Sequence, residues 1–133
     1  MKTKPKIKHK SLKTLRKTAW RLQSEYIRKS AADEHGLVRC YTCSRPHYWT
    51  DMELGHYIHR DCLDYTKDNL RVQCNFCNRR LHGNSGVFAE NLIKEIGYQR
   101  VEALRQAANK IKKFTVEELE ELILTYKQSA ESK

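Results

Sequence analysis

The sequence predicts an α+β fold in which helices flank a centre of short strands. Two CxxC pairs, Cys40 with Cys43 and Cys74 with Cys77, frame a segment rich in turn formers and poor in periodicity. On both sides of this segment, apolar residues recur at steps of three and four, which is typical of amphipathic helices. A chain of 133 residues is about one domain, and a core of that size is small enough to benefit from a metal staple.

The N-terminal part is strongly basic. Residues 1–30 hold 11 Lys and Arg against one acid, Glu25, within a chain of net charge +10. Such an arm binds phosphate backbones through counterion release, although a solubilising or ribosomal-type tail has the same composition. An anionic membrane surface is disfavoured because the arm lacks an acylation motif and strong apolar anchors. Residues 1–10 are expected to be disordered until they bind.

A basic amphipathic helix is predicted over residues 11–36, with Gly36 as its stop. One face carries an apolar stripe, which suits a core seam or a homodimer seam: Leu12, Leu15, Ala19, Leu22 and Tyr26. The opposite face carries basic residues that we expect to contact DNA phosphates: Lys13, Lys17, Arg21 and Arg28, with Arg16 at the border.

Short strands are expected next, at residues 37–40, 52–58 and 70–74. Helices return in residues 85–133. The first stripe is Val87, Leu92, Ile93 and Ile96 before Gly97, and the second is Val101, Leu104, Ala108 and Ile111. Thr115 and Glu118 form a capping box for a last, acidic helix, whose inward residues are Leu119, Leu122, Ile123 and Tyr126. We expect these helices to be scaffold, with the acidic face turned to solvent or to a partner.

The cysteines are better explained by metal binding than by disulfides. No apolar run is long enough for a membrane span, and no apolar h-region of a signal peptide follows the lysine-rich start, so a cytosolic protein is expected. Two CxxC turns can present four thiolates to one tetrahedral Zn²⁺. A thioredoxin-like redox pair would need a βαβ unit, which neither pair has. Cys62 has no partner at ligand spacing and is expected to be an incidental thiol.

Polar residues with catalytic potential cluster inside and just after the cysteine frame. They are Glu53, His56, His59, Asn69, Asn78 and His82. Asn78 and His82 are four residues apart, so on a helix they would share one face and one metal ion. A histidine on a facing strand could deprotonate water beside that ion. Hydrolysis of a phosphodiester needs this pair of elements, a base and a divalent cation.

The order CxxC, GH, NL and CxxCN resembles HNH nucleases, in which two strands and a helix hold one catalytic metal (a ββα-metal core). Residues 24–105 further resemble the phage NinG family, also called Rap, of recombination endonucleases. The resemblance lies in the segments SEYIRKSA, CYTC, LGHYIHR, DNLRVQCNFCNRRLHGN and LIKEIGYQRVEAL.

The resemblance implies a role for each matching position. His56 would be the general base, Asn69 would brace the active-site loop through backbone hydrogen bonds, and Asn78 would be a ligand of a catalytic Mg²⁺ or Mn²⁺. His82 falls where some HNH enzymes place a further metal-binding histidine. Ordinary packing for His56 and a helix cap for Asn78 are the structural alternatives.

The sequence departs from the HNH pattern at Gly55, because many of these enzymes have an Asp or His metal ligand immediately before the base. Glu53, Asp51 and His59 are the candidates to replace it, and His59 suits a phosphate contact or no role equally well. Strand alternation puts Asp51, Glu53 and Gly55 on one face and His56 on the other, so a bulge or turn at Gly55 is one way to reunite them.

We therefore expect a zinc-stapled HNH core over residues 37–84, between the N-terminal helix and the C-terminal helical extension. The expected function is a metal-dependent DNA endonuclease that leaves a 5′ phosphate. Arg60, Arg79 and Arg80 would add phosphate contacts. The resemblance implies branched substrates, such as D-loops and Holliday junctions, and the host cytoplasm if the chain is phage-encoded. Symmetric cutting of a junction would favour a homodimer. The alternative is a non-catalytic, zinc-stabilised nucleic-acid-binding module.

Overall fold

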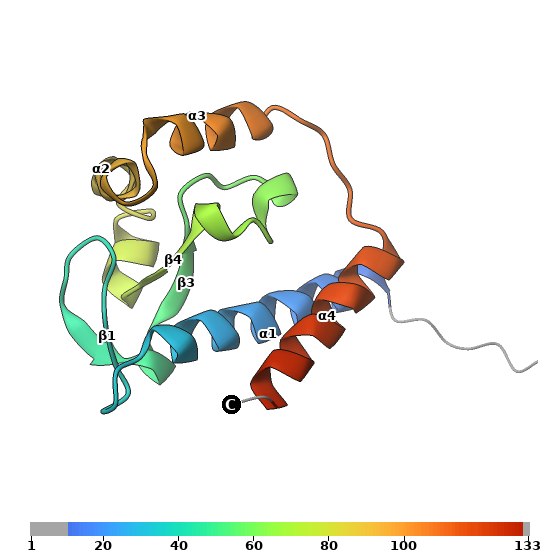
Figure 1. Cartoon of the computed structure of the whole chain (residues 1–133), viewed down its shortest axis with the longest axis horizontal. Coiled ribbons are helices and arrows are strands. Elements are labelled where there is room, and N and C mark those ends of the chain that lie inside the picture. Colours follow the sequence, from blue (N-terminus) through green and yellow to red (C-terminus); the bar gives the residue numbers. More distant parts are fainter. Residues whose placement is uncertain (1–10, 132–133) are drawn as a thin grey trace, which may run out of the picture.

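A computed structural model describes residues 11–131 and places an antiparallel hairpin at the centre of the molecule. The hairpin consists of β3 (Glu53–His56) and β4 (Leu70–Gln73). Helix α1 (Leu12–Ala31) contacts both of its strands, and α2 (Ser85–Ile96) with α3 (Tyr98–Ala107) lies at the opposite end of the molecule (Figure 1). The arm predicted over residues 1–10 falls outside the described residues.

Helix α1 begins where the sequence predicted but ends earlier. The Ser11 hydroxyl accepts a hydrogen bond from the Thr14 amide at 3.2 Å and caps the first turn. The helix ends at Ala31, before the predicted stop at Gly36. The Asp33 carboxylate accepts hydrogen bonds from the amides of His35 and Leu37, which makes a turn that continues into β1. Gly36 belongs to this turn, where its φ of 79° favours glycine.

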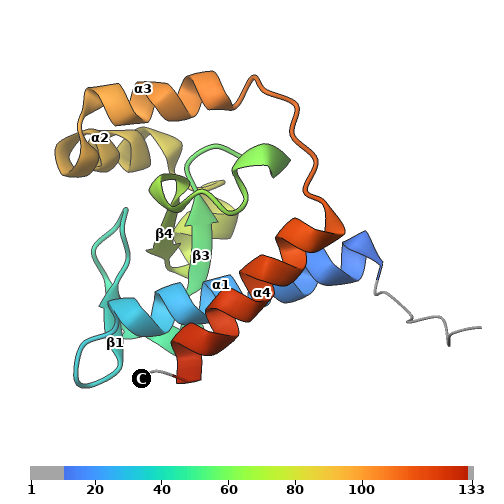
Figure 2. The ribbon, with the colours of Figure 1, turned by 45° about the vertical axis from the view of Figure 1, so that its right-hand side comes forward.

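The last helix, α4 (Val116–Glu131), packs along α1, and Figures 1 and 2 show the two side by side. The Thr115 hydroxyl accepts from the Glu118 amide and the Glu118 carboxylate accepts from the Thr115 amide, so the predicted capping box is present. Leu15, Ala19 and Leu119 are buried between the helices. Burying a leucine in such a core contributes about 2–5 kcal/mol relative to alanine. Leu15 and Ala19 of the apolar stripe offered for a homodimer seam are therefore covered by α4 of the same chain, while Leu12 at its start is 49% exposed.

A second hairpin, β1 (Leu37–Arg39) with β2 (Pro46–Tyr48), carries the first cysteine pair in its loop. The sequence did not indicate β2, because Pro46 opens it and its residues lie exposed at an edge. The other three strands lie within the predicted segments. Behind the cysteines, Val38, Met52 and Val72 form a buried apolar cluster that joins the two hairpins.

Helices α2 and α3 share a buried cluster made by Phe88, Leu92, Val101 and Leu104. Helix α3 ends at Ala107, so the predicted stripe is cut short and Ile111 is 95% exposed. The reason is the path of the chain, because residues 108–115 leave α3 to reach α4 (Figure 2). None of the described helices is both long enough and apolar enough to cross a membrane.

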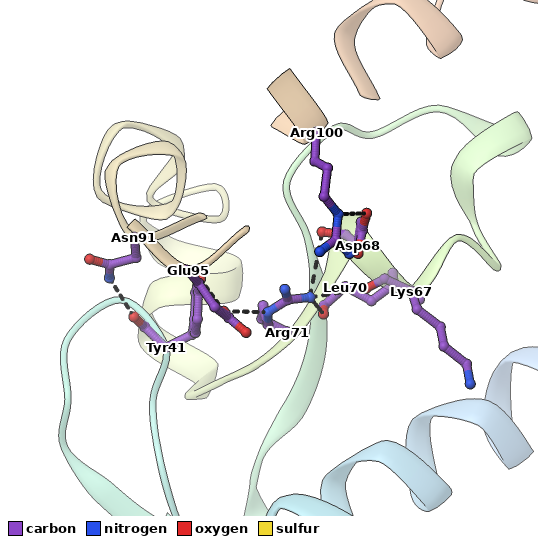
Figure 3. Close-up of polar contacts among 8 residues, drawn as sticks. All are labelled: Tyr41, Lys67, Asp68, Leu70, Arg71, Asn91, Glu95 and Arg100. Carbon is purple, nitrogen blue, oxygen red and sulfur yellow. Dashed lines mark hydrogen bonds and ion pairs between the residues drawn. The ribbon is translucent and has the colours of Figure 1, made fainter. Parts of the chain in front are cut away.

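A polar network centred on Arg71 and Glu95 ties these parts together (Figure 3). Arg71 of β4 donates to Glu95 of α2 at 3.0 Å, and Glu95 also accepts from the Tyr41 hydroxyl at 2.6 Å. Asn91 donates to the Tyr41 carbonyl. Partial burial favours the neutral form of Glu95, but the bonds from Tyr41 and Arg71 outweigh it and lower the pKa of the carboxyl. The network fixes the first cysteine turn, β4 and α2 in one arrangement.

Candidate metal centre and active site

The four paired cysteines converge on one point. Their Sγ atoms, from Cys40, Cys43, Cys74 and Cys77, all lie within 4.8 Å of one another. The 3.7 Å between the Sγ atoms of Cys43 and Cys74 is far longer than a disulfide bond of about 2.05 Å. It matches the edge of about 3.8 Å expected for a sulfur tetrahedron with Zn–S bonds of about 2.3 Å. The four cysteines therefore fit one zinc ion, as the CxxC spacing predicted.

Local backbone structure builds this cysteine site. The Ser44 amide donates to the Cys40 carbonyl at 2.9 Å, and the Asn78 amide donates to the Cys74 carbonyl at 3.0 Å, so each pair lies in a closed turn. Burial favours the neutral Cys40 thiol, but hydrogen bonds from Thr42 and from backbone amides lower its pKa to about 6. Burial raises the pKa of Cys77 to about 12. Metal binding must therefore release a proton from Cys77 at neutral pH.

His56, at the end of β3, faces α1. Its ring stacks on Trp20 with centroids 4.6 Å apart and planes inclined by 10°. Its Nε2 lies 3.3 Å from Oδ1 of Asp64, while no described residue makes a well-aligned hydrogen bond to that nitrogen. The two groups are thus within ion-pair distance but poorly aligned for a hydrogen bond. We interpret the contact as an electrostatic interaction by which Asp64 orients the imidazole of His56. The two side chains are about one-fifth exposed, at 19% and 21%.

A buried relay from α4 holds Asp64 in place. The fully buried side-chain amide of Gln23 in α1 donates to the Asp64 carbonyl at 2.9 Å. The Tyr126 hydroxyl of α4 donates to Oε1 of the same glutamine at 3.2 Å. The α1–α4 pair thereby fixes the loop that faces His56.

The His56 side chain lies in a groove of about 500 Å³ between α1 and the loop that carries Asp64. Three basic residues of α1 line this groove together with Trp20, His56 and Asp64: they are Lys13, Arg16 and Lys17. Arg16 is paired with Asp61 and Asp64 at 3.3 and 3.5 Å. Lys13 and Lys17 are exposed and make no ion pair with a described residue. The groove therefore combines an imidazole with free positive charge.

Asn69 is fully buried and binds the loop that follows His56. Its Oδ1 accepts from the Ile58 amide and its Nδ2 donates to the Ile58 carbonyl, both at 2.9 Å. These are backbone hydrogen bonds of the kind expected at this position. Its part in catalysis stays a prediction.

Glu53 and Asn78 meet on the opposite face of the hairpin. Asn78 donates to the Glu53 carboxylate at 3.0 Å, and Arg79 donates to both carboxylate oxygens. Burial favours the neutral acid, but the bonds from Arg79 and Asn78 lower the pKa of Glu53. The strand register is unbroken from Glu53 to His56, so there is no bulge at Gly55. Strand alternation keeps His56 on the face that packs against α1, and it keeps Glu53, together with Asn78, on the other face. Among the residues that the structure describes, the side chains of His56 and Asn78 make no direct contact.

The glycine at position 55 is explained by steric crowding. A Cβ at this position would lie 1.9 Å from Oε1 of Gln73, which packs across the strand. Gln73 is fully buried, and its Nε2 donates to the Thr42 hydroxyl and the Gly83 carbonyl. Its Oε1 has no hydrogen-bond partner among the described residues. This orphaned oxygen lies on the same strand face as Glu53, and oxygen donors of this kind suit Mg²⁺ or Mn²⁺.

His82 does not share a helical face with Asn78. Residues Phe76–Arg80 form a single π-helical turn, and His82 follows it with a φ of 50°. The Gly83 amide donates back to the Cys77 carbonyl at 2.9 Å, which ends the turn. Nε2 of the exposed His59 would lie 3.5 Å from a Cβ at Gly83, so the 82–83 turn borders the loop after β3. Desolvation and the nearby His56 lower the pKa of His59, and Asp64 opposes them only partly.

The predicted phosphate contacts fall into three groups. Lys13, Lys17, Arg21, Arg60 and Arg80 are exposed, so they are available to a polyanion. Arg28 is internal instead, since it donates to the carbonyls of Ser24 and Trp49 and lies over the Trp49 ring. Arg16 and Arg79 are occupied by carboxylates.

Residues 1–132 match the family described as Bacteriophage Lambda NinG protein. The chain belongs to the NinG family. The match confirms the family resemblance of the sequence and places the chain in a phage family associated with recombination. No curated protein and no solved structure matches the chain significantly.

In this NinG chain, the sequence did not single out three site residues, Trp20, Asp64 and Gln73. Trp20 follows the basic residues of the predicted N-terminal helix. The sequence placed it in that helix but did not indicate that it stacks on His56. Asp64 lies in a loop, and Gln73 is one polar residue in a short strand. A buried glutamine whose side chain packs over a glycine of the neighbouring strand is a signal only once the register is known.

Proposed function

We propose that this protein is a metal-dependent DNA endonuclease of the HNH type. The observation that carries the proposal is His56, which lies beside a carboxylate in a groove lined by free lysines, at the end of a hairpin that leads into a zinc knuckle. The order of strand, strand and helical turn, with Asn69 bracing the loop, supports the same assignment.

His56 is suited to take a proton from water. With Nε2 turned to Asp64, a proton held on that nitrogen leaves Nδ1 as the basic atom. The Trp20 stack fixes the ring plane, and the Asp64 carboxylate stabilises the imidazolium that forms. Hydroxide generated beside a phosphodiester would attack phosphorus in line and leave a 5′ phosphate.

Bound Mg²⁺ or Mn²⁺ would neutralise the phosphate and stabilise the leaving 3′ oxygen. Glu53 and Asn78 would hold it, with His82 on the adjoining turn as a further candidate. Glu53 supplies a carboxylate whose lowered pKa keeps it ionised at neutral pH. Arg79 is 70% exposed at its side chain, so it can leave Glu53 when a cation or a phosphate arrives.

The DNA is proposed to lie along α1. Lys13, Lys17 and Arg21 recur every four residues, so they form one stripe with a rise of about 6 Å between neighbours. Lys13 and Lys17 belong to the His56 groove, so a strand held by the stripe would pass the imidazole. The family association favours branched recombination intermediates, D-loops or Holliday junctions, as substrates.

Cleavage of labelled linear, nicked and four-way DNA in Mg²⁺ or Mn²⁺ tests this function. The proposal expects metal-dependent nicks with 5′ phosphate ends, and faster cutting of four-way than of linear DNA. Binding of all three DNAs without cutting would identify the protein as a zinc-stabilised binding module instead. Equal rates of cutting of linear and four-way DNA would support the endonuclease activity but contradict the proposed preference for branched DNA.

A further inference from the structure

We propose that Gln73 supplies the catalytic-metal ligand that Gly55 cannot. This inference rests on the proposed function, because it concerns the divalent ion of the same site. Glycine at position 55 leaves the strand without a ligand side chain before His56. The side-chain oxygen of Gln73 occupies the space that such a side chain would enter, 1.9 Å from an ideal Cβ.

The position of this oxygen is fixed by its own amide group. Nε2 of Gln73 donates to the Thr42 hydroxyl at 3.0 Å and to the Gly83 carbonyl at 2.9 Å. A flipped amide would set its oxygen against that carbonyl, so Oε1 is the atom that faces Gly55. Fully buried amide oxygens rarely lack a partner, and a bound ion is one of the recognised explanations.

The surroundings of Gln73 supply further donors of the right class. Glu53 is its direct cross-strand partner in the register, so both side chains lie on one face of the hairpin. Asn78 contacts Glu53 from the π-helical turn. An amide oxygen, a carboxylate and a second amide are hard oxygen ligands, which favour Mg²⁺ or Mn²⁺ over zinc. Zinc has its own site in the four thiolates.

The arrangement explains why the two positions belong together. Gly55 makes room for Gln73, and Gln73 carries the oxygen that Gly55 lacks. A side chain at position 55 and glutamine at position 73 would compete for one space, since both are buried within the hairpin. Either position alone, but not both, can therefore provide the ligand.

Binding of Mn²⁺ to the zinc-loaded full chain, measured by electron paramagnetic resonance, tests the proposal without reference to activity. Gln73→Ala is expected to weaken Mn²⁺ binding at least tenfold. Gln73→Met keeps most of the side-chain volume but has no oxygen ligand, and its soft thioether does not suit Mn²⁺, so it is also expected to weaken Mn²⁺ binding at least tenfold. Asn91→Ala is the control, because Asn91 is also a hydrogen-bonded amide side chain but lies in α2, where it donates to the Tyr41 carbonyl. It is expected to leave Mn²⁺ affinity unchanged.

A ligand exchange between the two positions provides the second arm. Gly55→Asp alone is expected to lower the melting temperature, because the new Cβ meets Gln73. The double variant Gly55→Asp with Gln73→Ala is expected to recover both folding and Mn²⁺ binding. If Gln73→Ala fails to fold, as shown by loss of zinc and of circular dichroism, Gln73→Met and the double variant decide the question.

The outcomes separate this inference from the proposed function. Unchanged Mn²⁺ affinity in Gln73→Ala or in Gln73→Met would overturn the role of Gln73 while metal-dependent cleavage by the wild type still supported the enzyme. A wild type that neither binds Mn²⁺ nor cleaves DNA would remove the proposed function itself.

Discussion

The imidazole of His56 lies flat against the indole of Trp20, with ring centroids 4.6 Å apart. The contact links the helix that carries the free lysines to the residue proposed as the base. Aromatic stacking of this kind contributes about 0.5–1.5 kcal/mol beyond buried area and also fixes a ring orientation.

Replacing Trp20 should therefore reduce cleavage more than it reduces DNA binding. Trp20→Ala is expected to slow single-turnover cleavage about tenfold or more, because the imidazole loses its fixed plane. Trp20→Phe keeps a ring in the stack and should retain most of the rate. Rates measured with DNA saturating each variant make the comparison. Equal rates for the alanine variant and the wild type would show that the stack has no functional part.

Zinc should be structural and present once per chain. Cys77→Ser removes one ligand from the tetrahedron, so the variant is expected to lose bound zinc and to melt at a lower temperature. The same loss should follow treatment of the wild type with a strong chelator. Elemental analysis with thermal melting checks both. A purified, folded wild type that contains no zinc would contradict the four-cysteine assignment.

The free lysines of α1 should control the salt dependence of DNA binding. Lys13→Ala with Lys17→Ala is expected to reduce the slope of log affinity against log salt by about 2, since each lost phosphate contact lowers it by roughly 0.9. Arg28→Ala is the control on the same helix, because Arg28 bonds to the protein itself. It should lower stability and leave the slope unchanged. An unchanged slope in the lysine variant would place the DNA elsewhere.

Glu95 should make the fold sensitive to acid. Its pKa is lowered in the folded state, so its stabilising effect is present above the unfolded pKa of about 4.3 and disappears as the pH falls through the folded value. Glu95→Gln is expected to melt below the wild type at pH 7, and the gap is expected to close as acid protonates the carboxyl in the folded state. A gap that stays constant with pH would show that Glu95 acts through shape alone.

The sequence was sufficient for features that depend on local pattern. Cysteine spacing predicted the metal site, and frequent turn formers without helical periodicity located β3 and β4. Helix stripes located α1, α2 and α4, and the capping box at Thr115 marked the start of α4. These features follow from neighbours along the chain, which one sequence displays directly.

Features that depend on contacts across the fold were out of reach. The pairing of His56 with Asp64 can be predicted only when the path of the loop that carries Asp64 is known. The packing of α4 on the α1 stripe depends on how two helices far apart in the sequence dock. The prediction that Asn78 and His82 share one helical face was wrong, because the chain turns at Gly83, whose amide donates to the Cys77 carbonyl. Gln73 was not predicted as a site residue, because its side chain fills the space left by Gly55 on the neighbouring strand, and this packing is visible only in the structure.

The central claim is that His56 acts as the base of a metal-dependent nuclease, and one comparison tests it most directly. It is the single-turnover rate of DNA cleavage by wild type and by His56→Ala, at equal zinc content, saturating Mg²⁺ and equal DNA occupancy. We predict metal-dependent cleavage by the wild type and a rate at least 100-fold lower for His56→Ala, the loss typical of removing a general base. Equal rates for the two proteins would contradict the assignment of His56.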